Sequence, residues 1–236
     1  MLSGDLARKL PFRVSPAALG TGISRETLQR AILLGSALAA WQWVTPLLIR
    51  TGPDIFPLPR DVMAGFATLL PSRDFWVSVG TSVGRVLTGF GLATVIGATL
   101  GMGMGASPRI EALVDFTVET LRPLPAMAWI PIAILWFGVG NTSSVFLVTL
   151  GAFFPIVINS AAGVKATGRA YQKAALTMGA GRFLRFRRVT FPGALPYLLL
   201  GCRIGLGVGW MVIVSAEMVV AHSGLGFLIM KARSFA

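Results

Sequence analysis

Long apolar blocks separated by short charged segments dominate the pattern of this chain. A helix needs about 20 apolar residues to cross the hydrocarbon core of a bilayer. Five runs come close to or exceed that length with at most one charge each: 31–49, 75–105, 124–140, 143–164 and 192–216. The pattern therefore predicts an all-α, polytopic membrane protein with five spans.

The segments between the runs predict shorter elements. Residues 1–30 mix proline, glycine, serine and charge, which indicates a polar N-terminal tail ahead of a membrane domain at 31–236. Residues 62–70 predict a short interfacial helix inside a proline-rich loop. Acidic residues at 111, 115 and 119 recur every four positions beside apolar ones, which predicts an amphipathic helix with a solvated acidic face.

Composition and charge support a membrane protein. Apolar residues make up 54% of the 236 and charged residues only 13%, about half of the ~25% typical of soluble domains. The net charge of +12 also suits nucleic-acid binding, but the basic residues fall between the spans, fourteen on one side of the membrane against three on the other. The positive-inside rule explains this bias better and places the N-terminus and the loop at 165–190 in the cytoplasm.

The loop at 165–190 is the most informative part of the sequence. Four apolar residues spaced i, i+3, i+4 and i+7 form one stripe of a predicted short helix: Tyr171, Ala174, Ala175 and Met178. Gly179 and Gly181 then provide a helix stop and a turn. A second short helix is predicted from Arg182, with Arg185 and Arg188 on it. Two interpretations stay open, a rigid knob that docks in a partner's cleft and a basic loop that lies on anionic headgroups.

The spacing within this loop resembles a family signature. Lys173-Ala174-Ala175 is followed after three residues by Gly179, after nine more by Val189, and after one more by Phe191-Pro192. This is similar to the EAA signature of ABC importer permeases, whose cytoplasmic loop engages the partner ATPase. The resemblance implies a coupling segment at about 169–190 with these ATPase-coupling residues: Tyr171, Lys173, Ala174, Ala175, Met178, Gly179 and Pro192.

Further segments resemble the nitrate, sulfonate and taurine branch of these permeases. They are residues 81–90, 121–140 and 153–159, and the stretches GCRIGLG, SAEM and HSGLGFL nearer the C-terminus. The resemblance implies a type I ABC importer permease fold in a bacterial inner membrane. It implies as partners a second copy of the permease, two copies of an ATPase subunit and an extracytoplasmic solute-binding protein.

The same resemblance implies a mechanism. A permease of this kind is a non-catalytic subunit that works by alternating access, while ATP and Mg are bound by the partner subunits and this chain holds no cofactor and no metal. The solute is expected to be a small anion such as a sulfonate, taurine, nitrate or bicarbonate.

The chain departs from the family pattern in two places. Lys173 stands where the signature has an acidic residue, a reversal of charge at the ATPase contact. Family members also have a sixth span after the SGLGFL stretch, whereas the last apolar run here, 225–230, is too short to cross a bilayer. We therefore expect the natural gene product to continue beyond residue 236 by about 20 residues or more.

Small residues and buried charges provide further candidates. Glycines repeat every four residues at 97, 101 and 105 and again at 201, 205 and 209; this spacing suits close helix packing, either within the chain or at a dimer or gate interface. Arg85 and Arg203 lie inside spans, where they either line an anion path or bond to backbone and snorkel. Glu217 either pairs with an arginine or lines the outer gate.

Two rival classes of membrane protein are an integral membrane enzyme and a stand-alone secondary transporter. An integral membrane enzyme needs clustered acids, a zinc-binding helix or an activated serine, and this chain has nine scattered acidic residues and one histidine. A stand-alone secondary transporter favours internal repeats and intramembrane acids for ion coupling, and no such repeat is found. Co-purification of an ATPase separates all three classes.

Overall fold

The computed structural model describes residues 25–48 and 57–234, which fall into two compact units, Met1–Ala67 and Thr68–Ala236. The first unit holds α1 (Arg25–Leu48) and most of α2 (Pro59–Leu69). α1 contains most of the run predicted as the first span, and α2 matches the short helix predicted at 62–70. Of the predicted tail at 1–30, residues 1–24 lie outside the described range.

In its described residues, every secondary-structure element of the second unit is a helix. Its long helices are α3 (Arg73–Ala106), α6 (Asn141–Ala166) and α9 (Phe191–Val220). The shorter elements are α4 (Pro108–Leu121), η3 (Ala126–Trp129), α5 (Ile130–Phe137), α7 (Arg169–Thr177), α8 (Arg182–Arg185), η4 (Phe186–Thr190) and α10 (Leu225–Ser234). The fold class is therefore all-α, as the apolar pattern predicts.

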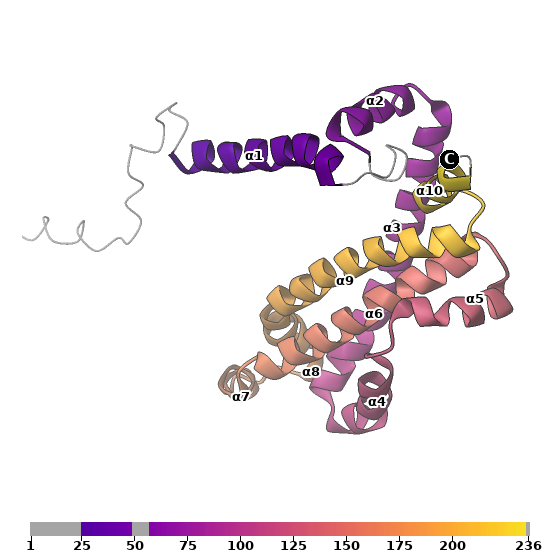
Figure 1. The fold of residues 1–236 in the computed structure, drawn as a ribbon. Coiled ribbons are helices and arrows are strands. Elements are labelled where there is room, and N and C mark those ends of the chain that lie inside the picture. The colour runs from indigo at the N-terminus through magenta and orange to yellow at the C-terminus, as the bar shows by residue number, and fades with distance from the viewer. Residues whose placement is uncertain (1–24, 49–56, 235–236) are drawn as a thin grey trace, which may run out of the picture. The chain divides into compact units, whose positions relative to one another are not determined.

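α6 forms the centre of this unit because it packs along both α3 and α9 (Figure 1). Wholly buried residues from the three helices, among them Val86, Leu147 and Ile213, form one continuous apolar cluster. A second cluster joins α6 to α3 and α4 through Val157, Met104 and Val118. The core is thus a three-helix layer with α4, α5 and the short elements attached at its ends.

Both glycine rows lie against α6. A Cβ placed on Gly101 would lie 2.3 Å from the carbonyl oxygen of Val157, and one on Gly205 would lie 3.0 Å from that of Ala152. Only glycine lets the helix backbones approach this closely. The rows are therefore contacts within the chain, which settles the alternative left open by the sequence in favour of intrachain packing.

Three helical stretches are long and apolar enough to cross a membrane: α3, α6 and the continuous run Arg182–Val220. A fourth is counted if α4 and the η3–α5 pair form one broken span, since they are bent by 92° across a short break. Among the described residues, these segments support the assignment of a polytopic membrane fold.

The run at 124–140 differs from the straight span that the hydropathy pattern predicts. It begins with a 3-10 turn and continues as α5, which has only 8 residues and is therefore about 12 Å long. Proline interrupts helical hydrogen bonding, and Pro123, Pro125 and Pro131 fall in or beside this stretch. The run is therefore a broken or re-entrant segment connected to the amphipathic helix α4, which forms where the acidic repeat predicts it.

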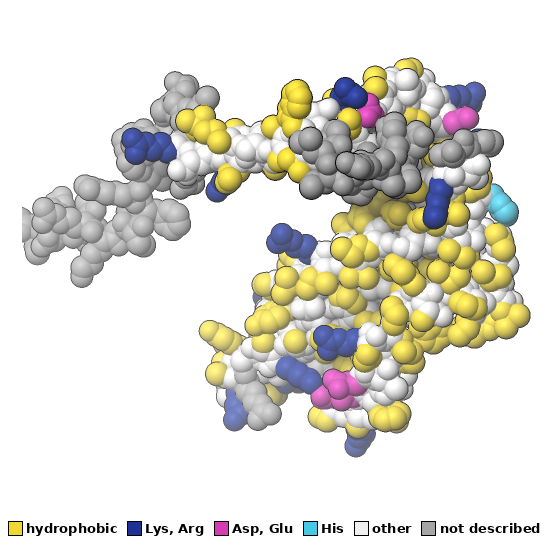
Figure 2. Space-filling view, in the orientation of Figure 1, with side chains coloured by type: hydrophobic (Ala, Val, Ile, Leu, Met, Phe, Trp, Pro, Cys, Tyr) yellow, Lys and Arg dark blue, Asp and Glu magenta, His cyan; other side chains and the backbone are white. Residues whose placement is uncertain are grey.

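Large apolar side chains cover much of the outer surface of the second unit (Figure 2). Leu135 on α5 is 81% exposed and Met211 on α9 is 73% exposed. Exposure of this extent marks surfaces that contact lipid or another protein. The packing of the unit therefore matches the environment of a membrane rather than water.

Candidate functional site

A short helix stands at one end of the second unit, opposite the end that carries α10 (Figure 1). α7 follows α6 after a break at Thr167 and Gly168. At its far end Gly179 has φ +78°, and its N–H donates to the carbonyl of Leu176 at 2.9 Å while the Ala180 N–H donates to that of Ala175 at 3.0 Å. These two bonds form a Schellman motif, which ends the helix at a residue that favours glycine.

The segment after α7 differs from the predicted second short helix. α8 has only 4 residues and continues through the π-helical turn η4 into α9, so residues 182–220 form one continuous helical stretch. Pro192 is the second residue after the π-turn. A proline lacks the N–H that an α-helix needs, and its ring clashes with the preceding turn. The arginines predicted on a separate helix therefore lie at the base of a long apolar helix.

The predicted stripe of α7 is divided between two environments. Tyr171 and Met178 are 71% and 80% exposed, and Ala174 is also exposed. Ala175 is only 5% exposed because it packs against this chain. The stripe borders a cavity of about 480 Å³ that Arg188, Val189 and Gly193 also line. Lys173 and Pro192 are both exposed.

A buried polar network lies at the opposite end of the helices. The guanidinium of Arg85 on α3 donates to the carboxylate of Glu217 on α9 at 2.7 Å and to the backbone carbonyl of Ser223 at 2.7 Å. Its remaining N–H groups bond to Asn141 at the start of α6 and to the hydroxyl of Ser223. Arg85 is 5% exposed and Glu217 is fully buried. A buried charge pair is tolerated only when its remaining polar atoms are also satisfied, and here they are.

The Glu217 carboxylate also holds the start of α10. It accepts hydrogen bonds from the Ser82 hydroxyl at 2.7–2.8 Å and from the backbone N–H of Gly226 at 3.0 Å. The N–H of Leu225 donates to Ser82 at 2.9 Å. An acidic group at a helix N-terminus is stabilised by the helix dipole. A Cβ on Gly226 would lie 2.7 Å from that of Glu217, so the close approach depends on glycine.

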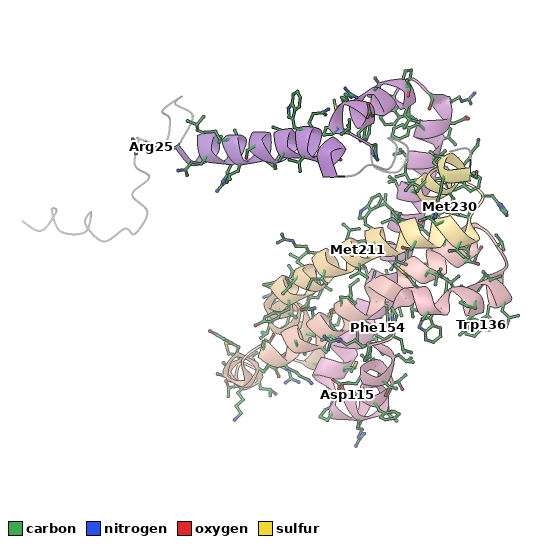
Figure 3. All side chains as sticks on the ribbon, viewed as in Figure 1. Arg25, Asp115, Trp136, Phe154, Met211 and Met230 are labelled. Carbon is green, nitrogen blue, oxygen red and sulfur yellow. The ribbon has the colours of Figure 1, made fainter. Side chains whose placement is uncertain are left out.

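The third intramembrane charge, Arg203, lies apart from this network. It is exposed on α9, and within the described part of the chain no hydrogen bond or ion pair involves its side chain. Beside it, Ile204 lines a mostly apolar cavity of about 460 Å³ between α6, α9 and the proline-rich break after α4. Figure 3 labels Phe154 on α6 and Met211 on α9, which also line this cavity, and its polar side chains are Arg122 and Asn159.

The structure thus brings Arg85 and Glu217 together and leaves Arg203 separate. Sequence reasoning named these three charges but missed Ser82, Asn141 and Ser223, which complete the network. Small polar residues in apolar runs are common and carry no individual signal. The one available clue was the position of Asn141 and Ser223 directly beside span ends.

Comparison with known proteins identifies the family of this chain. Residues 93–235 match the family model described as the binding-protein-dependent transport system inner membrane component. The chain belongs to this permease family. It is 34% identical over 218 residues to the taurine transport system permease protein TauC of Escherichia coli, with 90% of this chain and 79% of that protein covered.

Two other relatives have related names. The permease is 39% identical to the putative aliphatic sulfonates transport permease protein SsuC of Escherichia coli, over 77% of this chain and 69% of that one. It is 34% identical to the nitrate import permease protein NrtB of Synechocystis, over 89% and 78%. It is accordingly a multi-pass, non-catalytic permease subunit of an ABC importer, in a family whose members work with an ATPase and a binding protein.

Proposed function

We propose that this permease forms the translocation path for a small anion and is driven by two copies of an ATPase through α7. It acts as a homodimer, receives its solute from an extracytoplasmic binding protein, and has its N-terminus in the cytoplasm. ATP and Mg are held by the ATPase subunits. The solute class is supported by relatives named for taurine, aliphatic sulfonates and nitrate, all of which are or contain oxyanions.

The exposed side of α7 carries the proposal. A rigid helix fixed between a break at Gly168 and a Schellman motif at Gly179 presents Tyr171, Ala174 and Met178 outward. Exposed apolar side chains in such an arrangement suit insertion into a partner's cleft. The excess of Lys and Arg in the loops on this side of the membrane supports a cytoplasmic location for α7, where ATP is available.

Arg203 is the candidate for attracting the anion. It lies 12 residues from the start of α9, which corresponds to about 18 Å along the helix, too far for its side chain to reach the headgroups easily. An intramembrane charge usually faces a water-filled cavity or a partner. A second copy offers no free carboxylate at mid-span depth in α3, α6 or α9, since Asp74 lies in the first turn of α3 and Glu217 is fully buried and already paired. Arg203 therefore faces the path and counters the charge of the solute.

Reconstitution tests the coupling role. The permease, its ATPase and its binding protein are assembled in liposomes, and ATP hydrolysis and solute uptake are measured together. Ala174→Glu places a charge in the exposed part of the stripe and should abolish solute-stimulated hydrolysis and uptake. Leu176→Glu is the matched control, since Leu176 is 53% exposed on the same helix but lies off the stripe. Normal coupled transport in Ala174→Glu would remove α7 as the coupling element.

A further inference from the structure

A polar cavity lies beside α7, at the end of the unit where α3 and α6 finish and α9 begins. Its volume is about 750 Å³, and three arginines line it: Arg109, Arg182 and Arg185. We call this cavity the basic pocket. Its lining contains no acidic residue. Figure 2 shows dark blue side chains gathered at this end of the molecule together with the magenta ones of α4.

The three guanidinium groups have no partner among the described residues. No hydrogen bond or ion pair in that part of the chain involves the side chain of Arg109, Arg182 or Arg185, and the Nε of Arg185 is buried without an acceptor. A buried donor without an acceptor destabilises the fold, and more so when it is charged. Glu111, in the first turn of α4, is already paired with Lys165. The positive charge of the pocket is therefore uncompensated by this chain.

The start of α4 adds further donors. Ser107 and Pro108 line the pocket, and Ser107 caps α4 without a side-chain hydrogen bond. The first backbone N–H groups of an α-helix have no partner within it and favour an anion. Gln172 of α7 and Thr190 of η4 contribute uncharged polar side chains to the same lining. The helices α4, α7, α8 and η4 thus contribute hydrogen-bond donors, and no carboxylate, to the lining of the basic pocket.

The depth of the pocket indicates which anions can reach it. Ala106 at the end of α3, Val164 near the end of α6 and Thr190 just before α9 all line it, so it lies where the apolar spans end. Next to it α4 exposes Leu113 and Phe116, which are 79% and 78% exposed. Juxtamembrane arginine clusters flanked by apolar side chains suit anionic lipid headgroups, while the open side also admits a soluble anion.

We propose that the basic pocket binds a phosphate group, carried by an anionic lipid or by a small soluble phosphate. Guanidinium forks bind phosphate oxygens in a bidentate manner, and a bound phosphate would compensate the positive charge of the three arginines, which this chain leaves without a counter-charge. The bound phosphate joins α4, α7 and α8, and so fixes the base of α7 through Gln172. The inference rests on the proposed function only in placing this end of the unit in the cytoplasm.

The test measures binding rather than transport. The permease–ATPase complex, and the permease alone, are delipidated in detergent and their melting temperature is followed on addition of short-chain phosphatidylglycerol, short-chain phosphatidylcholine, inorganic phosphate or pyrophosphate. We expect stabilisation by phosphatidylglycerol and none by phosphatidylcholine, whose phosphate is offset by its own cation. A response to phosphatidylglycerol alone identifies a lipid as the source, and an equal response to pyrophosphate identifies a soluble phosphate.

Matched variants assign the binding to the pocket. The combined change Arg109→Gln, Arg182→Gln and Arg185→Gln should weaken binding by at least about tenfold, since each removes a charge-assisted bond. Arg73→Gln, Lys231→Gln and Arg233→Gln remove the same number of charges at the opposite end and should leave it unchanged. If the triple variant does not fold, Arg182→Gln alone, at an exposed position, should weaken binding in the same direction.

Three results would overturn the proposal. They are equal binding by the wild type and the pocket variants, no response to any phosphate compound, and binding to the isolated permease that disappears in the complex, which would assign the arginines to the ATPase contact. Failure of the proposed function is distinguishable from failure of the phosphate proposal. If the wild-type permease binds phosphate but shows no coupled uptake, only the proposed function is overturned. If it shows coupled uptake but binds no phosphate, only the phosphate proposal is overturned.

Discussion

The arginines at the two ends of the second unit differ in whether this chain provides their polar partners. At the end near α10, Arg85 is 5% exposed and its guanidinium bonds to Glu217, Asn141 and Ser223. At the end near α7, Arg109, Arg182 and Arg185 share a polar cavity with no acid in its lining. Charge that is satisfied within the chain holds helices together, whereas charge left without a partner is available to something outside it.

The difference follows the connectivity of the helices. At the first end, α3, α6, α9 and α10 are joined through the buried Arg85–Glu217 pair: Glu217 bonds to Ser82 and to Gly226 at the start of α10, and Arg85 bonds to Asn141 at the start of α6. The other end carries α8, which has only 4 residues, and a π-helical turn. We therefore expect substitutions at the first end to change folding stability and substitutions at the second to change coupling.

Removing the carboxylate of the network should have the largest effect. Glu217→Ala leaves the buried guanidinium of Arg85 without its counter-charge, and breaking a buried pair in this way costs about 3–5 kcal/mol. The free energy of unfolding in detergent, or the yield of folded protein, measures the loss. Glu119→Ala, at an exposed position on α4, is the control and should change stability by less than about 0.5 kcal/mol. Equal stability of both variants would mean that the network holds nothing together.

Adding a methyl group to the tight glycine row should have the next largest effect. A Cβ at Gly101 would lie 2.3 Å from the carbonyl oxygen of Val157, whereas one at Gly84 on the same helix has nothing within 4 Å. Gly101→Ala should destabilise by about 1–3 kcal/mol, and Gly84→Ala should stabilise by about 0.5–1 kcal/mol. Thermal unfolding of the two variants measures the contrast, and the same sign for both would contradict the assignment of the row to α6.

Arg203→Gln sharpens the comparison between the two mid-span arginines. Since Arg203 has no partner in the described residues, its loss should leave stability within about 0.5 kcal/mol of the wild type. Uptake of an anionic solute should fall about tenfold, equivalent to about 1.4 kcal/mol of lost interaction. Arg203→Lys keeps the charge and should retain more uptake than Arg203→Gln. Destabilisation comparable to that of Glu217→Ala would instead assign Arg203 a structural role.

Lys173→Glu should have the smallest effect. Lys173 is exposed on α7, and an exposed ion pair contributes about 0.2–1 kcal/mol. If the partner ATPase carries a matching acid, the affinity of the complex should fall by at most about fivefold. The loss should be greater at low ionic strength, because salt screens the new repulsion. An affinity that rises on this substitution would show that the partner surface is basic, as the usual family signature implies.

Several features were predictable because they depend on local sequence. The apolar runs predict α3, α6 and α9, the acidic repeat predicts α4, and the spacing around Gly179 predicts the end of α7. The family membership follows from the same loop and its neighbouring segments. In each case the signal lies within a single element, where hydropathy, helical periodicity and glycine's access to positive φ determine the outcome.

The partner of each polar group was not predictable. Arg85 and Glu217 are 132 positions apart, and nothing in the sequence distinguishes this pairing from one between Glu217 and Arg203. The break in the run at 124–140 and the burial of Ala175 depend likewise on what packs against them. Hydropathy reports the cost of transferring a segment into lipid and contains no information on its neighbours.

The sequence by itself determined that this chain is a helical membrane protein, because apolar length acts through the chain's local chemistry, and its similarity to known permeases identified the family. The tertiary structure decided which arginine is neutralised inside the fold and which remain available. That decision depends on distances between helices brought together by α6, and electrostatic interactions depend on distance and burial rather than on position in the sequence.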